Sequence, residues 1–167
     1  SSLVALAIGD ALASVLMVQR GFNKKDFARN HPGGELGKQL SLNVESVMHH
    51  INDVAQIYED ESISHCATKM TEKPLGAALL LDNNKLLGIV TEGDIRKSIA
   101  KSNDLSQPIK NFINYNPIAV NRSISILDAM KVMEDRTSQI SVLPIVDSDN
   151  NCLGLLTLHD LYQTKLV

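Results

Sequence analysis

The chain has 167 residues, 44% of them hydrophobic, and a formal net charge of −3. This is enough material for one compact domain or two very small ones. With three Phe, three Tyr, no Trp and no long basic run, the composition argues against binding of single-stranded or duplex nucleic acid. The two cysteines form no disulfide framework, which suits a reducing, cytoplasmic compartment.

Residues 3–20 are predicted to form one helix that ends at Gly21. Apolar side chains cover most of its circumference, and a helix of this kind is normally buried. The units that follow are too small to surround it. We therefore expect that the chain is a piece of a longer protein or that a partner subunit covers this helix. Gly9-Asp10 interrupts the longest apolar stretch and the start lacks a basic region, so neither a membrane span nor a signal peptide is expected.

Residues 22–30 predict a short second helix, with Asn23 or Asp26 as its N-cap. His31-Pro-Gly-Gly34 follows as a breaker and tight turn, and residues 35–40 predict a brief helical turn. His31 is a loop histidine, a residue type that often acts as a general acid or base in enzymes. Taken alone, it is more readily explained as a solvated side chain than as a catalytic group.

The rest of the chain contains one unit twice. Each copy has an extended segment, a helix and a hairpin, at 54–58, 63–72 and 79–88 in the first and at 117–120, 124–136 and 144–154 in the second. A polar linker at 103–108 separates the copies. The predicted order within each unit is therefore strand, helix, strand, strand, helix.

Each copy ends in the same junction, Gly88-Ile-Val-Thr91-Glu-Gly-Asp94 in the first and Gly154-Leu-Leu-Thr157-Leu-His-Asp160 in the second. The Thr residues and the Asp residues are each 66 positions apart (157 − 91 and 160 − 94). Thr is placed as the N-cap of a helix and Asp one turn inside it. Such a helix start can receive a phosphate, and the Asp could hold sugar hydroxyls. The same pattern is also a variant of the capping box, which needs no ligand.

These paired junctions and hairpins resemble a tandem pair of CBS domains, over about residues 42–167. The resemblance implies an α+β fold of two βαββα units, residues 42–104 and 105–167, with nucleotides bound in the cleft between them. It also implies a set of nucleotide-binding residues, namely Thr91, Asp94, Thr157, His159, Asp160 and, from the start of a strand, Ile118 and Ala119.

A second resemblance concerns residues 1–41. Ile8-Gly-Asp-Ala-Leu-Ala13, Arg20-Gly-Phe22 and Asp26-Phe-Ala-Arg-Asn-His31-Pro-Gly-Gly-Glu-Leu-Gly37 are similar to the end of the sugar isomerase (SIS) domain of arabinose-5-phosphate isomerases. The match departs only mildly, at Asn30, where Ser is common. That family joins an SIS domain to a CBS pair and interconverts ribulose 5-phosphate and arabinose 5-phosphate, on the way to Kdo for lipopolysaccharide or capsule. The resemblance places its catalytic histidine at His31, whereas its catalytic Lys and Glu would lie upstream, so this chain alone should not turn over substrate.

We therefore expect a regulatory, cytoplasmic CBS pair that binds a nucleotide effector (CMP, CMP-Kdo, AMP or ATP), requires no cofactor, and forms a homodimer or homotetramer. Two alternatives remain open: a ligand-free pair that only holds subunits together, and a fragment that supplies His31 in trans. Neither a membrane nor a nucleic-acid partner is expected. His49-His50 and His65-Cys66 lack metal-ligand spacing, so they are expected to cap or to face solvent rather than to bind metal.

Overall fold

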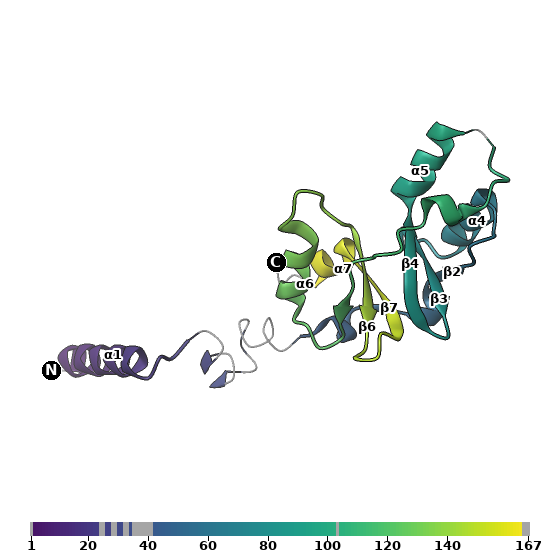
Figure 1. Cartoon of the computed structure of the whole chain (residues 1–167). Coiled ribbons are helices and arrows are strands. Elements are labelled where there is room, and N and C mark those ends of the chain that lie inside the picture. The colour runs from purple at the N-terminus through teal and green to yellow at the C-terminus, as the bar shows by residue number, and fades with distance from the viewer. Residues whose placement is uncertain are drawn as a thin grey trace. The chain divides into compact units, whose positions relative to one another are not determined.

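The structure, a computed structural model, describes residues 2–23, 26–27, 30–31, 34, 42–102 and 104–164. It divides into two compact units, Ser1–Leu42 and Asn43–Val167 (Figure 1).

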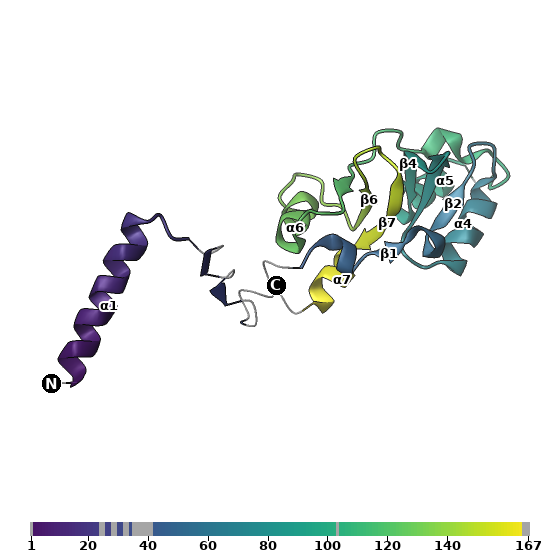
Figure 2. The same cartoon turned by 90° about the horizontal axis from the view of Figure 1, so that it is seen from below.

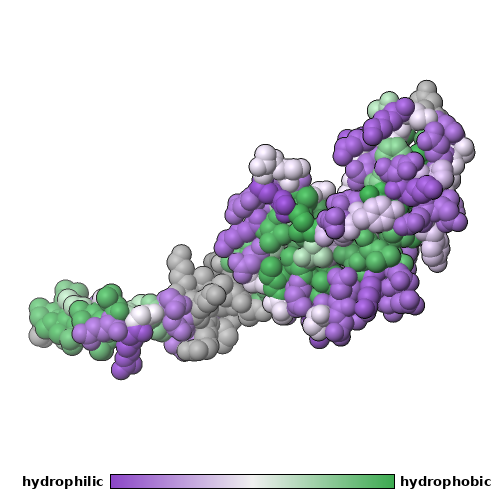
Figure 3. Space-filling model, viewed as in Figure 1, coloured by the Kyte–Doolittle hydropathy of each residue, from purple (hydrophilic) through white to green (hydrophobic). Residues whose placement is uncertain are grey.

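In the first unit, helix α1 covers Ser2–Gln19 as expected, and Gly21 follows it at φ +60°, the left-handed conformation typical of a helix end. All of its residues are exposed, and its large apolar side chains range from Met17 at 44% to Leu3 and Val18 at 83%. Figure 3 shows a mostly apolar surface on this helix. By length and composition α1 could cross a membrane. A single such helix is weak evidence, since core helices and signal sequences pass the same test. The expected absence of a membrane span stays a prediction.

Asn23 caps the short helical segment after α1. Its side chain accepts a hydrogen bond from the Asp26 N–H at 3.3 Å, and the Asp26 carboxylate accepts one from the Asn23 N–H at 3.1 Å. This reciprocal pair identifies Asn23 as the N-cap. The helical turn expected at 35–40 lies outside the described residues.

The second unit contains the two predicted repeats in the predicted order. Its helices and strands are β1 (His49–His50), β2 (Ala55–Ile57), α4 (Ile63–Glu72), β3 (Ala77–Asp82), β4 (Lys85–Thr91), α5 (Glu92–Lys101), β5 (Val120–Asn121), α6 (Ile126–Glu134), β6 (Val142–Val146), β7 (Cys152–Thr157) and α7 (Leu158–Gln163). Short 3-10 turns cover Val44–Ser46, Ile51–Asp53 and Ile109–Phe112. The expected α+β fold of two βαββα units is confirmed.

Each repeat forms its own sheet. The first has the order β2-β3-β4, and the second has β5-β6-β7 extended by β1 at the edge of β7. In both repeats the first two strands are parallel, because a helix connects them, and the last two form an antiparallel hairpin. Asn83 and Asn84 take positive φ at the first hairpin tip, as Asn does in tight turns.

The two sheets pack against each other while the helices cover their outer faces. Side chains alternate along β3, so that Ala78 and Leu80 contact the helix-side core with Ile63. Ala77 and Leu79 point the other way and join Val142 and Leu155 of the second repeat. Figures 1 and 2 show α4 and α5 beside the first sheet and α6 and α7 beside the second.

Each repeat also receives a segment of chain that precedes the other. His49 in β1 pairs with Leu155 of β7, and Asn114 pairs with Ile89 of β4. These crossings explain the glycine that opens each junction. A Cβ on Gly154 would lie 2.0 Å from the carbonyl oxygen of His49, and one on Gly88 would lie 2.5 Å from a methyl group of Ile113.

Candidate functional site

Both junctions form the capping arrangement that the sequence predicts. Thr91 is the N-cap of α5, and its N–H and hydroxyl donate to Asp94 Oδ2 at 3.0 and 2.7 Å. Thr157 is the N-cap of α7, and it donates to Asp160 Oδ2 at 2.9 and 2.6 Å. Both threonine hydroxyls therefore already have an acceptor in their own junction.

Asp94 is held in its charged form. Partial burial acts to raise its pKa, but the hydrogen bonds from Thr91 and the nearby ammonium of Lys97 outweigh burial, so the pKa lies below the ordinary 3.8. Lys97 Nζ donates to Asp94 Oδ1 at 3.1 Å. The Asp94 carboxylate thus binds both the N-cap residue of α5, Thr91, and the ammonium group of Lys97.

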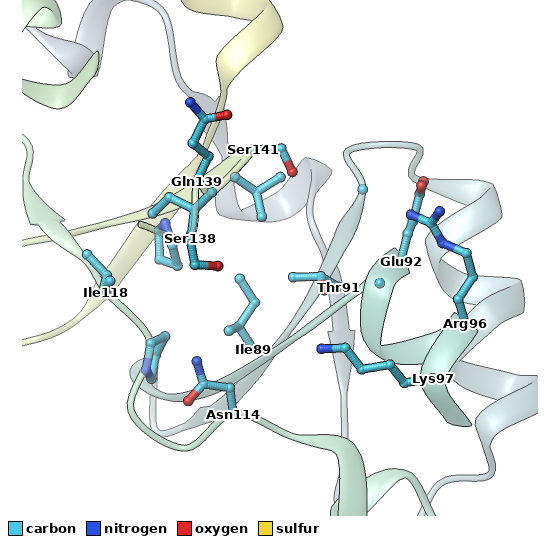
Figure 4. A pocket seen from close by; sticks show the side chains of 16 residues that line it. Ile89, Thr91, Glu92, Arg96, Lys97, Asn114, Ile118, Ser138, Gln139 and Ser141 are labelled. Carbon is cyan, nitrogen blue, oxygen red and sulfur yellow. The ribbon is translucent and has the colours of Figure 1, made fainter. Parts of the chain in front are cut away.

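A cavity of about 460 Å³ opens where α5 begins and lies between the two repeats (Figure 4). The first repeat contributes the helix start and the cations of α5, and the second contributes the segment before β5 and the loop before β6. The lining residues are Gly76, Ile89, Thr91, Glu92, Gly93, Arg96, Lys97, Asn114, Pro117, Ile118, Ser138, Gln139, Ile140, Ser141, Val142 and Pro144. We call this cavity the Thr91 cleft.

The walls of the Thr91 cleft differ in chemistry. One side presents the N-terminus of α5 with Glu92, Arg96 and Lys97, whose side-chain charges sum to a positive value, a setting that favours an anionic group. The opposite side combines apolar surface at Ile118 with the short polar side chain of Ser138. A molecule with a charged end and a flat, partly apolar end would match this arrangement.

The expected site residues are divided among several places. Thr91 and Ile118 lie in the wall of the Thr91 cleft, whereas Asp94 lies behind Thr91 in the capping arrangement. Ala119 packs against the core between the sheets.

Thr157, His159 and Asp160 belong to the other junction. His159 is exposed and its Nε2 lies 2.8 Å from Gln163 Nε2. Asp160 Oδ1 lies 3.2 Å from Nε2 of His49, which comes from β1. His49 was expected to cap or to face solvent. It is instead half-buried and reaches across to the second repeat.

His31 lies in the first unit and is exposed. Its ring stacks on Phe27 with 4.5 Å between centroids, and its Nδ1 lies 3.2 Å from the Phe27 carbonyl oxygen. Within the described ranges, no three His, Cys, Asp or Glu side chains gather in a way that could hold a metal ion.

Sequence reasoning missed the cations Arg96 and Lys97, the cleft residues Asn114 and Ser138, and the contact of His49. The cations could have been found, because they lie on the exposed side of α5 one turn after the motif. Asn114 and His49 could not, since their positions depend on chain crossings between the repeats.

A paired fold with a cleft at a strand-to-helix junction is the architecture of CBS modules. The family model described as CBS domain matches residues 44–101 and 109–165, and the chain belongs to this family. It is 40% identical over 169 residues to arabinose 5-phosphate isomerase KdsD of Pseudomonas aeruginosa and 35% identical over 167 residues to that of Francisella tularensis. The alignments include 100% and 99% of this chain but 51% and 50% of the relatives, so the chain spans about half the length of the curated relatives it matches.

Solved structures show the same fold. CBSX2 in complex with AMP has a TM-score of 0.62 at 21% identity, over 75% of this chain and 97% of that one. The CBS pair of MJ0100 in complex with 5-methylthioadenosine and S-adenosyl-L-methionine has a TM-score of 0.65 at 21% identity, over 74% and 95%.

Proposed function

We propose that this chain is the regulatory CBS pair of an arabinose 5-phosphate isomerase, together with the end of its SIS domain, and that the pair binds a nucleotide or nucleotide-sugar effector. The Thr91 cleft is the observation that carries this proposal. Similarity to the KdsD isomerases supports the enzyme class. The adenosine-type ligands of structural neighbours support the ligand class.

The cleft suggests how such a ligand would bind. The Thr91 hydroxyl donates to Asp94, and the Glu92 N–H donates to the Gly76 carbonyl oxygen. The donors for a phosphate are therefore the Gly93 N–H and the side chains of Arg96 and Lys97. The base would lie against Ile118 on the opposite wall. The junction with Thr157, His159 and Asp160 is the second candidate for the same ligand class.

Calorimetry with CMP, CMP-Kdo, AMP and ATP tests the binding. Lys97→Ala should weaken binding by about tenfold or more, since a charged hydrogen bond contributes about 1.5–3 kcal/mol. Lys131→Ala is the matched control, because Lys131 makes the same i,i+3 pair with an aspartate, Asp128, outside the cleft. If no nucleotide binds the wild type at millimolar concentration, the cleft is not an effector site and the alternative of a ligand-free scaffold is favoured.

We assign the catalytic role in the whole isomerase to His31. Interconversion of an aldose and a ketose moves a proton between adjacent carbons through an enediol, which suits the general acid–base chemistry of an imidazole. The contact of Nδ1 with the Phe27 carbonyl orients the ring and favours the tautomer with a basic Nε2. In the full-length protein, His31→Ala should lower turnover by orders of magnitude and leave the fold intact; an active variant refutes the assignment. The resemblance implies that the catalytic Lys and Glu lie upstream of these residues, so we expect the chain to be inactive alone unless His31 acts in trans.

For binding to regulate turnover, the effector must prefer one arrangement of the CBS pair and the SIS domain over another. The pathway to Kdo, for lipopolysaccharide or capsule, makes a cytidine effector our first choice and a cytoplasmic location the expected one. Comparing isomerase rates with and without effector in the whole protein tests this step.

A further inference from the structure

The repeat makes the two junctions directly comparable. Thr91 and Thr157 are equivalent, and so are the residues two positions before them, Ile89 and Leu155. Because Asn114 pairs with Ile89 and His49 pairs with Leu155, Asn114 and His49 occupy equivalent positions beside the two junctions.

At the Thr91 cleft the residue at this position, Asn114, leaves space for a ligand. The Asn114 side chain accepts a hydrogen bond from the N–H of Asn116 at 3.0 Å, within its own turn. The connection from α6 to β6, Asp135–Ser141, is longer than the one from α4 to β3, Lys73–Gly76, and four of its residues line the cavity.

At the Thr157 junction, side chains of the protein itself already contact the polar atoms that correspond to those of the Thr91 cleft. The His49 ring, which comes from a distant part of the chain, lies 3.2 Å from Asp160 Oδ1, whereas the equivalent oxygen of Asp94 accepts from Lys97, an exposed side chain of its own helix. Lys73 Nζ donates to the carbonyl oxygens of Asn52 and Val54 at 2.5 and 3.2 Å. Val54 and Pro117 precede their helix caps, Ser62 and Ser125, by the same number of positions (62 − 54 and 125 − 117). Val54 is therefore equivalent to Pro117, which lines the Thr91 cleft.

The Thr157 junction also lacks the cations. Sixty-six positions after Arg96 and Lys97 stand Tyr162 and Gln163. Tyr162 donates to Glu134, and the Gln163 side chain contacts His159. A phosphate placed there would meet no positively charged side chain at these positions.

We infer that the CBS pair binds one nucleotide per chain, in the Thr91 cleft, and that His49 and Lys73 occupy the equivalent ligand position beside the Thr157 junction. The inference rests on the proposed function, because it specifies where that ligand binds and how many are bound. Asp160 then stabilises the fold and does not bind the ligand.

The test is calorimetric stoichiometry with AMP and CMP-Kdo on the whole chain. The wild type should bind one equivalent. Ser138→Trp, which fills the Thr91 cleft from an exposed loop, should abolish binding. His49→Asn/Lys73→Ala/Gln163→Lys, which gives the second junction the polar side chain and cation of the first, should bind two equivalents.

Other outcomes separate the two claims. A wild type that binds two equivalents overturns the inference and leaves the proposed function standing, whereas a wild type that binds no nucleotide overturns the proposed function. Binding that survives Ser138→Trp places the ligand elsewhere and also overturns the inference, even if the triple variant fails to fold. A folded triple variant that still binds one equivalent refutes the role of His49 and Lys73.

Discussion

Nε2 of His49 lies 3.2 Å from Oδ1 of Asp160, which joins the first strand of the CBS pair to its last helix across 111 positions of chain. Both side chains are partly exposed, at 37% and 17%. Their coupling should therefore be modest, about 0.5–1 kcal/mol in a double-mutant cycle with His49→Ala and Asp160→Asn. Urea unfolding measures it. A coupling near zero would mean that the contact does not hold the two elements together.

The junction glycines should differ in their tolerance of alanine. Gly154→Ala places a Cβ against rigid backbone and should cost about 3 kcal/mol or more. Gly88→Ala meets the Cγ2 methyl of Ile113 at 2.5 Å and the Asn114 carbonyl oxygen only at 3.2 Å, so it should cost less. Gly93→Ala is the control, since its Cβ would lie 3.5 Å from Thr91 Oγ1 inside a helix. It should be neutral or stabilising by about 0.5–1 kcal/mol. Equal losses at Gly88 and Gly154 in urea unfolding would contradict the described crossings.

Asp94 should make stability depend on pH in the acid range. Its folded pKa lies below the ordinary 3.8, so its contribution is present above that value and is lost as the pH falls through the folded pKa. The difference in unfolding free energy between the wild type and Asp94→Asn should shrink between about pH 6 and about pH 3. Asp53→Asn, at an exposed carboxylate without a hydrogen bond in the described part of the chain, should show a smaller change. A constant difference for Asp94→Asn would refute the assignment.

Both cysteines should be inert in the folded protein. Burial raises the pKa of Cys66, with Glu61 adding to the effect, and burial raises that of Cys152; each reaches about 11. Thiolate, the reactive form, becomes dominant only above these values. A disulfide reagent at neutral pH should label neither thiol before unfolding and both after it. Fast labelling of the native protein would show that one of these sites opens readily.

The exposed apolar surface of α1 should drive assembly. Soluble monomers rarely expose a continuous apolar surface of this extent, so we expect a homodimer or larger symmetric oligomer of the chain. Light scattering at micromolar concentration checks the mass, and deletion of residues 2–19 should lower the oligomeric state. A monomeric full chain would refute the prediction.

The local elements were well predicted because each carries its own signal. Helix α4 covers the expected residues 63–72, since Ser62 caps it and apolar residues recur at helical spacing. The hairpins were also predicted, from Asp and Asn at their tips. The strands at 54–58 and 117–120 are shorter than expected, because only Ala55–Ile57 and Val120–Asn121 find a pairing partner.

The composition of the candidate site was only partly predictable. The Thr-x-x-Asp motif marked both junctions equally, because capping and phosphate binding favour the same residue types. What distinguishes the junctions lies far away in the sequence: Ser138 beside one, His49 and Lys73 beside the other. No local sequence pattern predicts which of these side chains lies beside which helix N-terminus.

The exchange of edge segments between the repeats has a consequence for folding. Neither half can complete its sheet alone, since His49 pairs with β7 and Asn114 pairs with β4. An excised half would expose both an unpaired strand edge and the apolar face carrying Leu79 or Leu155. The pair is therefore the smallest cooperative folding unit, and local opening of one half should propagate to the other. The two repeats, although each is a copy of the same motif, should therefore fold and unfold together.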